Sequence, residues 1–191
     1  MKPMKHSRTI VLTGLCLFAG PAFAHTGNHL VTGFTSGLTH PLSGLDHLLA
    51  MIAIGLWAAQ QGGRALWAVP AAFVGAMVLG GGLAWTGLAL AHVETAISAS
   101  VLVLGLLIAT RRQWAVTAGM AVAAGFALFH GYAHGLEMPQ ATSPALYALG
   151  FVLATAFLHG VGIAGSLSGR YAMQAAGAAI AASGLAMLFG M

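Results

Sequence analysis

Six long apolar stretches, separated by short turns, make up most of the chain and constrain its fold more than any other feature. An α-helix needs about 20 apolar residues to cross the roughly 30 Å of hydrocarbon in a bilayer, and each stretch is near that length. The expected spans are Thr39–Ala59, Ala65–Trp85, His92–Thr110, Trp114–His134, Pro144–Ser166 and Tyr171–Phe189. No linker between them is long enough to separate domains. The sequence therefore predicts one all-α, polytopic membrane helical bundle.

The composition agrees with a lipid bilayer as the surroundings. Of the 191 residues, 59% are hydrophobic and only 5% are charged, and the mean hydropathy is +0.89. A soluble domain carries about 25% charged residues, so this chain could not cover a water-facing surface. Seven Lys and Arg outnumber three Asp and Glu. They are spread too thinly to form a basic patch, and we expect no nucleic-acid partner.

The N-terminal residues 1–24 have the three parts of a secretory signal peptide. Basic residues come first, at Lys2, Lys5 and Arg8. The apolar run Thr9–Gly20 follows, and the small-x-small sequence Ala22–Ala24 ends the segment. We expect cleavage after Ala24, which leaves residues 25–191 as a single transmembrane domain. Cys16, the only cysteine, would leave with the peptide, so disulfides and thiolate ligands are excluded from the mature chain.

The basic residues of the mature chain orient the bundle. They lie in the loops after the first, third and fifth expected spans, at Arg64, Arg111, Arg112 and Arg170. The loops after the second and fourth spans carry no Lys or Arg. The positive-inside rule places the arginine side in the cytoplasm. A cleaved signal peptide independently places His25 outside, and the two arguments agree for an even number of spans. We predict six spans with both mature termini outside.

All three acidic residues of the chain lie close to histidines. Asp46 directly precedes His47, Glu94 follows His92 by two residues, and Glu137 follows His134 by three. In the predicted topology, these clusters lie in the outer half of the membrane or at its outer edge. A charged side chain at the centre of a span costs about 2.5–3.5 kcal/mol on insertion scales. Such residues usually face the bundle interior and mark a site or a pathway.

The cluster on the fourth expected span has the spacing of metal ligands. His130 and His134 are four residues apart, which aims two imidazoles at one ion, and Glu137 follows one turn later. Imidazoles with carboxylates suit a borderline divalent ion, Ni²⁺, Co²⁺, Zn²⁺ or Cu²⁺, and favour soft Cu(I) less. Because the ligands must be unprotonated, metal uptake is expected to weaken as the pH falls through the range in which histidine protonates.

The cluster at the start of the first expected span is less regular. On a continuous helix, His40 and His47 share a face two turns apart, whereas Pro41 and Gly44 could instead open the first turn and bring His40 toward Asp46. Asp46 can bind a cation directly or accept a hydrogen bond from a ligating imidazole. The predicted metal ligands, taken together, are His40, Asp46, His47, His130, His134 and Glu137.

Five further residues are secondary candidates. His92 and Glu94 are either ligands or residues at the interfacial start of a helix, where the helix dipole favours Glu94. His25 and His29 form either a capture site with the freed α-amine or a solvated tail. His159 lies deeper, on the cytoplasmic half of the fifth span, and is either a packed polar contact or a second station on a path.

Three features together resemble the HupE/UreJ family. They are a signal peptide ending Ala-Phe-Ala-His, the sequence His40-Pro-x-x-Gly-x-Asp46-His47-Leu-Leu-Ala-Met, and Phe-His130-Gly-x-Ala-x-Gly-x-Glu137. The resemblance covers the whole mature chain. It implies uptake of Ni²⁺, with Co²⁺ as the second candidate, across the inner membrane of a Gram-negative-type cell, in support of hydrogenase or urease maturation. The motif residues of the family carry over onto His40, Asp46, His47, His130 and Glu137, and His134 lies at a more variable position.

The leading hypothesis is therefore a permease and not an enzyme. We expect a secondary transporter, because the chain has no P-loop for direct use of ATP. A second hypothesis is an intramembrane zinc-dependent hydrolase that uses the same His and Asp cluster, with Ser43 as a participant. A third is a haem-binding electron carrier with histidine pairs from facing helices. An open site with a lateral groove to lipid favours the hydrolase, whereas a polar path that continues to the cytoplasm favours the permease.

Overall fold

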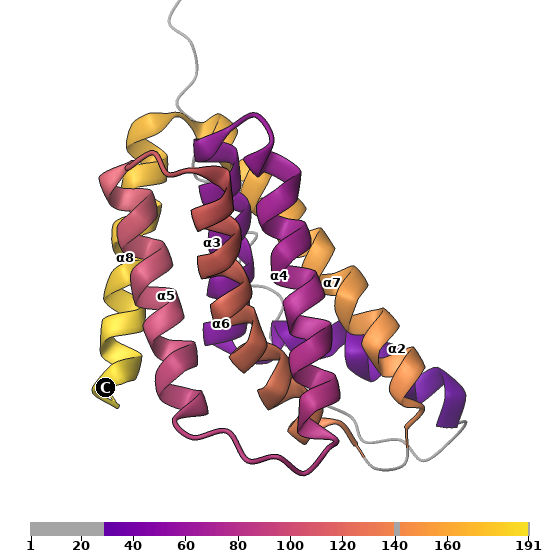
Figure 1. Ribbon diagram of the computed structural model, residues 1–191. Helices are drawn as coiled ribbons and strands as arrows, with labels where there is room; N and C mark the ends of the chain where they lie inside the picture. The colour runs from indigo at the N-terminus through magenta and orange to yellow at the C-terminus, as the bar shows by residue number, and fades with distance from the viewer. Residues whose placement is uncertain (1–28, 140–141, 191) are drawn as a thin grey trace, which may run out of the picture.

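The computed structural model describes residues 29–139 and 142–190, which form a bundle of seven α-helices and two short 3₁₀ helices (Figure 1). The predicted signal peptide and His25 lie outside the described residues. The helices are α2 (His29–Thr39), α3 (Leu45–Gln61), α4 (Ala65–Ala84), α5 (Val93–Thr110), α6 (Val116–Glu137), α7 (Pro144–Gly165) and α8 (Arg170–Leu188), and the 3₁₀ turns are η1 (His40–Leu42) and η2 (Ser166–Ser168).

The helices α4 to α8 are each long and apolar enough to cross a membrane. The bent pair formed by α2 with η1 and by α3 makes a sixth candidate span. The prediction of an all-helical, multi-pass membrane bundle is therefore confirmed. The bounds of the last five predicted spans agree with the helices to within a few residues, the largest difference being that α6 continues three residues beyond His134, to Glu137.

The first predicted span is wrong in outline, because residues 39–59 do not form one continuous helix. α2 ends at Thr39, α3 begins only at Leu45, and the two helical segments are bent by 79°. Pro41 has no backbone N–H with which to continue the hydrogen bonds of α2. Gly44 then takes an extended conformation (φ −104°, ψ 123°) as the N-cap of α3. Hydropathy predicts no helix before Thr39, yet α2 forms and packs on α7.

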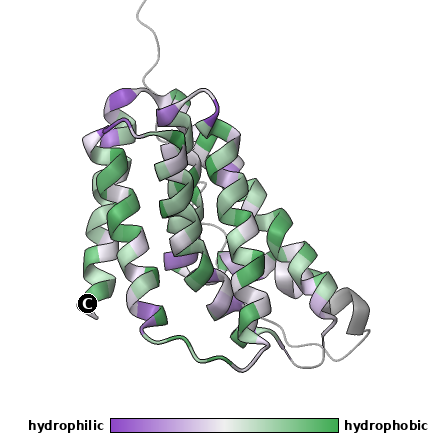
Figure 2. Cartoon of the chain, in the orientation of Figure 1, coloured by the Kyte–Doolittle hydropathy of each residue, from purple (hydrophilic) through white to green (hydrophobic). Residues whose placement is uncertain are grey.

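α3 is the central helix of the bundle. It contacts α4, α5 and α7, and its side chains from Ala50 to Ala58 are mostly fully buried. Around it, α4 packs along α6, α5 packs along α8, and α2 packs along α7 (Figure 1). The outward faces remain apolar, as at Leu79 and Phe157, which are about 70% exposed (70% and 69%). Figure 2 shows that hydrophobic residues predominate along the helices, as expected for contact with lipid.

Glycines bring helix backbones into direct contact, as small residues do at membrane helix interfaces. A Cβ added to Gly131 of α6 would overlap the carbonyl of Met77 on α4, and one added to Gly105 of α5 would overlap the backbone of Ala181 on α8. Gly135 lies in similarly close contact with Gly81 of α4. The sites of closest approach between α4 and α6 are therefore fixed next to the predicted ligands of α6.

The two ends of the bundle differ in chemistry. The loops after α3 and α5 meet at one end, where Gln61 donates to the carbonyl of Arg112 at 2.9 Å and accepts from the amide of Trp114 at 2.9 Å. Since the helices alternate in direction, the turn from α7 to α8 with Arg170 lies at the same end, which is strongly hydrophilic in Figure 2. The connections from α4 to α5 and from α6 to α7 lie at the opposite end, together with η1.

Candidate metal centre

The break between α2 and α3 positions the first histidine cluster. His40 begins η1, and Asp46 lies in the first turn of α3, where the positive end of the helix dipole stabilises a carboxylate. Gly44 makes room for this arrangement, because a Cβ added to it would lie 2.7 Å from Oδ1 of Asp46 and 3.2 Å from Nδ1 of His47. The absence of a side chain at position 44 therefore lets the carboxylate fold back onto the next residue.

Asp46 orients the imidazole of His47. Oδ1 of Asp46 accepts the backbone N–H of His47 at 2.7 Å and lies 2.8 Å from Nδ1 of the same residue. An ionised carboxylate only accepts, so the proton of the neutral imidazole sits on Nδ1 and the lone pair on Nε2. Nε2 is buried and has no hydrogen-bond partner in the described part of the chain. Metal-binding histidines commonly show this pairing with a carboxylate, which raises the basicity of the free nitrogen.

The two histidines of α6 face the same region from the other side. His130 and His134 are buried, one turn apart, and their rings lie with centroids 4.7 Å and 4.0 Å from that of His47. Both nitrogens of His134 and Nδ1 of His130 lack hydrogen-bond partners among the described residues. Buried polar nitrogens are nearly always paired, so this group of unpartnered atoms is a sign of a ligand site.

Ser100 of α5 orients the ring of His130. Its Oγ lies 2.6 Å from the carbonyl of Ile97 and 2.8 Å from Nε2 of His130. A carbonyl only accepts, so the single hydroxyl proton goes to Ile97 and the hydroxyl oxygen accepts from Nε2–H. Nδ1 of His130 then carries the lone pair. Ser100 was not among the predicted site residues, because a serine within an apolar span has no signal that separates it from ordinary helix packing.

His40, His134 and Glu137 form the tightest group of potential ligands, and we call them the outer triad. Each offers one ligand atom, and these atoms all lie within 4.8 Å of one another. Nε2 of His40 lies 2.9 Å from Oε2 of Glu137, and Nδ1 of His134 lies 3.8 Å from the same oxygen. The chain opens at Pro41, as one of the two predicted alternatives has it, but His40 turns toward Glu137 of α6 and not toward Asp46.

A polar cavity of about 390 Å³ opens beside the outer triad. Its lining is His40, Ser43, Gly44, Asp46, His47, Glu94, His134 and Glu137. The chain has three acidic residues in all, and every one of them lines this cavity. Three carboxylates in its lining give the cavity a negative potential that attracts cations. Glu94 thus joins the other predicted ligands, whereas His92 is exposed at the N-cap of α5 and is not part of the lining.

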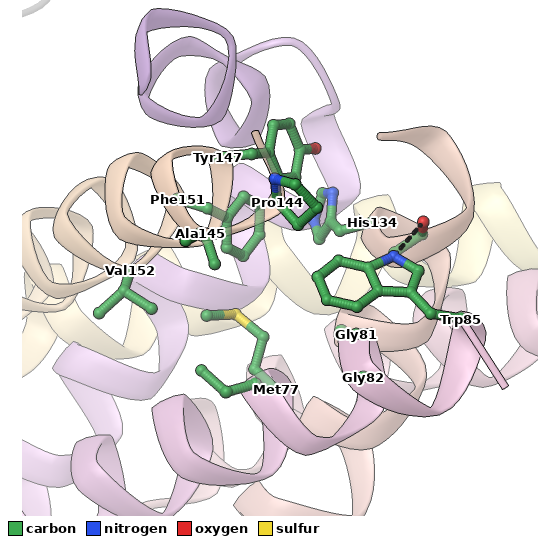
Figure 3. A pocket seen from close by; sticks show the side chains of 14 residues that line it. Met77, Gly81, Gly82, Trp85, His134, Pro144, Ala145, Tyr147, Phe151 and Val152 are labelled. Atoms are coloured by element: carbon green, nitrogen blue, oxygen red, sulfur yellow. Dashed lines mark hydrogen bonds between the residues drawn. The ribbon is translucent and has the colours of Figure 1, made fainter. Parts of the chain in front are cut away.

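An apolar groove of about 400 Å³ also borders His134 (Figure 3). α4, α6 and α7 form it, with Met77, Tyr147 and Phe151 among its walls. The indole N–H of Trp85 donates to the carbonyl of Gly135 at 3.1 Å at its edge. His134 therefore borders both a polar cavity and an apolar groove.

The remaining candidates lie apart from these two cavities. His159 of α7 is 3% exposed, and its ring packs on Phe73 with centroids 5.3 Å apart. Its Nε2 has no partner among residues 29–139 and 142–190. His29 is the first residue of α2, and His25 lies outside the described residues. The proposed capture site at the N-terminus therefore stays a prediction.

The six predicted ligands come together at two levels. The outer triad borders the polar cavity, which His47 also lines. His47 is in edge-to-face contact with His130, which does not line the cavity, and we call these two residues the inner pair. Asp46 supports the inner pair through His47. Two imidazoles and one carboxylate in the triad suit a borderline divalent cation, with the open side toward the cavity available for water.

The bundle of long apolar helices defines the chain as a multi-pass membrane protein. One cavity contains every acidic side chain and several histidines, so the bundle holds a candidate cation site. Comparison with known proteins gives the family. HupE / UreJ protein is the family that matches, over residues 13–187. Protein HupE of Rhizobium leguminosarum bv. viciae is 44% identical over 194 residues, which cover 98% of this chain and 100% of that protein. The chain therefore belongs to the HupE/UreJ family. No solved structure matches it.

Proposed function

We propose that this protein is a secondary permease that carries Ni²⁺ from the periplasm to the cytoplasm, where the ion serves the maturation of a hydrogenase or a urease. Co²⁺ and Zn²⁺ are the other candidate ions. The observation that carries the proposal is the cavity that contains all three carboxylates of the chain next to the outer triad. The similarity to Protein HupE and the family membership support the same assignment.

Capture begins at the polar cavity. A hydrated divalent cation is attracted by Asp46, Glu94 and Glu137 and exchanges part of its water for the outer triad. The lone pairs on Nε2 of His47 and Nδ1 of His130 belong to the inner pair, whose tautomers Asp46 and Ser100 fix. Two neighbouring sets of nitrogen ligands allow the ion to lose water stepwise. Such a path lowers the cost of carrying a charge into hydrocarbon.

The proposed direction of transport and the proposed membrane follow from the difference between the two ends of the bundle. The arginine end of the bundle lies in the cytoplasm by the positive-inside rule, which puts the polar cavity on the periplasmic side of a bacterial inner membrane. Cleavage of the signal peptide after Ala24 agrees with that orientation. No ATP-binding loop is visible in the sequence, so the proposal involves no direct use of ATP by this chain.

Uptake of radioactive nickel into proteoliposomes tests the proposal. The double variant His40→Ala, Glu137→Gln removes two ligands of the outer triad, and we expect its influx to fall by at least about tenfold, as for lost metal-supporting groups in other proteins. The matched control is His92→Ala, which removes an exposed imidazole outside the cavity and should behave as the parent. Equal accumulation by the parent, the double variant and empty liposomes would refute transport.

The intramembrane zinc hydrolase is retained as a second candidate because the apolar groove reaches His134. A lipid-like substrate could approach a metal on the outer triad through this groove, and Ser43 lines the polar side. Incubation of the zinc-loaded protein with bilayer lipids, followed by mass spectrometry, distinguishes the two: cleaved lipid supports the hydrolase.

The haem hypothesis is not supported by the spacing of the histidines. The ring centroid of His47 lies 4.7 Å from that of His130 and 4.0 Å from that of His134, which leaves no gap for a macrocycle.

A further inference from the structure

The face of α7 that points into the bundle connects the candidate metal centre with His159. Phe151, Thr155 and His159 follow at intervals of four residues, and each step is about 6 Å along a helix. The ring of Phe151 lies 4.0 Å from that of His134, and the ring of His159 lies on Phe73. Thr155 is therefore located between the metal centre and His159, and it is fully buried.

The hydroxyl of Thr155 has an uncommon environment for a helical threonine. Its Oγ1 lies 3.5 Å from Sδ of Met51 on α3 and 3.7 Å from Sδ of Met77 on α4. The hydroxyl of Thr110, like that of Ser183, instead donates to a carbonyl four residues earlier on its own helix, which is the usual arrangement. Thr155 has turned away from its own backbone and toward two thioether sulfurs from two other helices.

Two histidines that pack on Phe73 each have an unpartnered nitrogen. Nδ1 of His130 and Nε2 of His159 are buried and have no hydrogen-bond partner in the described ranges. Phe73 lies between the two imidazoles, with ring centroids 5.9 Å from His130 and 5.3 Å from His159. Buried nitrogens are nearly always paired, because each unpaired buried polar group destabilises the fold.

We propose that Met51, Met77 and Thr155 form a dry binding station for a dehydrated borderline divalent cation, between the inner pair and His159. Two thioether sulfurs and one hydroxyl oxygen are neutral donors, so they replace water ligands without changing the charge of the bound ion. Thioether sulfur suits Ni²⁺ better than Mg²⁺, which holds its water and prefers oxygen ligands. The station would therefore discriminate against abundant hard cations. This inference rests on the proposed permease function.

The double variant Met51→Leu, Met77→Leu tests the station. Leucine conserves the volume of methionine and usually costs little stability, so the bundle should remain folded. In proteoliposomes, we expect the maximal rate of nickel influx to fall by about tenfold, while KM and calorimetric nickel binding at the outer triad stay unchanged. The matched control is Met173→Leu, a buried methionine of α8 away from the path, which should transport as the parent does.

Thr155 provides a second, independent pair of variants. Thr155→Val removes the hydroxyl at nearly constant shape and should slow influx, whereas Thr155→Ser keeps the hydroxyl and should restore it. An unchanged maximal rate in the double methionine variant, or equal influx with Val and Ser at position 155, would overturn the station and leave the permease intact. Absence of nickel influx by the parent protein would overturn the permease function and the station together.

Discussion

A single hydroxyl proton decides which nitrogen of His130 can bind a metal. Because Ser100 donates to Ile97, it can only accept from Nε2–H of His130, and the lone pair is fixed on Nδ1. Asp46 does the same for His47 with the opposite nitrogen, leaving Nε2 free. Two imidazoles of the inner pair are thus held in defined tautomers by neighbours that never need to touch the ion.

Replacement of Ser100 by alanine should therefore impair transport without removing a ligand. The variant leaves Nε2–H of His130 buried and unpartnered, at a cost of about 1–3 kcal/mol, and the ring can relieve it by changing its tautomer. We expect nickel influx to fall by about tenfold and the ¹⁵N NMR signals of His130 to lose their single tautomer. Ser100→Thr should retain both properties. Parental influx in Ser100→Ala would show that the tautomer of His130 does not matter.

The sequence identifies residues whose burial in a membrane would be costly, and it misses residues whose burial costs little. Asp46, His130 and Glu137 can be predicted as site residues because carboxylates and imidazoles have no place against lipid. Ser100 and Thr155 cannot, because a helical hydroxyl can satisfy itself on its own backbone and so occurs anywhere in a span. Only the structure shows that their hydroxyls point to an imidazole and to two sulfurs.

At the scale of the element, the break between α2 and α3 is the feature that hydropathy could not place. The apolar character continues from α2 through η1 into α3, so a window average includes residues on both sides of the bend. Pro41 and Gly44 mark the break in the sequence, but a proline near a helix end is also compatible with a continuous span that begins there. The direction of the chain before the break depends on packing against α7.

Gly44→Ala is predicted to weaken metal binding through one steric contact. The backbone of Gly44 (φ −104°, ψ 123°) is in a region that alanine adopts without strain, so the conformation itself is not at risk. The added Cβ, however, would lie 2.7 Å from the carboxylate oxygen of Asp46 and displace it from His47. We expect about tenfold weaker nickel binding, as when a partner of a ligating histidine is lost.

Calorimetry on the purified protein measures this effect, and Gly75→Ala is the matched control. A Cβ at Gly75 of α4 would meet nothing within 4 Å, and alanine favours a helix over glycine by roughly 0.5–1 kcal/mol. Gly75→Ala should therefore bind nickel as the parent does. Parental affinity in Gly44→Ala would mean that the contact between Asp46 and His47 does not support the site.

For the whole molecule, the sequence predicts the class of fold but not the way the helices pair. Five of the spans are located to within a few residues because length and apolarity alone define them. Length and apolarity do not predict which helices become neighbours. Lipid and a helix interface are both apolar, so the sequences of α4 and α5 have no polar face that would show which side packs on another helix. Close glycine contacts such as that of Gly131 on Met77 select the partner, and these depend on the three-dimensional register.

The orientation of the bundle determines the direction of the proposed transport, and the absence of cysteine after the predicted signal peptide makes this orientation directly measurable. Cys16 is the only cysteine of the chain, so a parent protein cleaved after Ala24, as predicted, serves as an unlabelled blank. Leu88 lies in the connection from α4 to α5 at the end with the polar cavity, and its side chain is 56% exposed. Leu167 of η2, at the arginine end, is 87% exposed.

With the arginine end in the cytoplasm, Leu88→Cys should react with a membrane-impermeant maleimide added to intact spheroplasts, whereas Leu167→Cys should react only after permeabilisation. Both positions are exposed and lie in connections between the long helices, so a difference between them reflects sidedness and not burial. The polar cavity and its carboxylates would then face the side from which the ion arrives. The reverse labelling pattern would place the cavity in the cytoplasm. The same geometry would then require the outer triad to load from inside the cell, and the permease would export its ion.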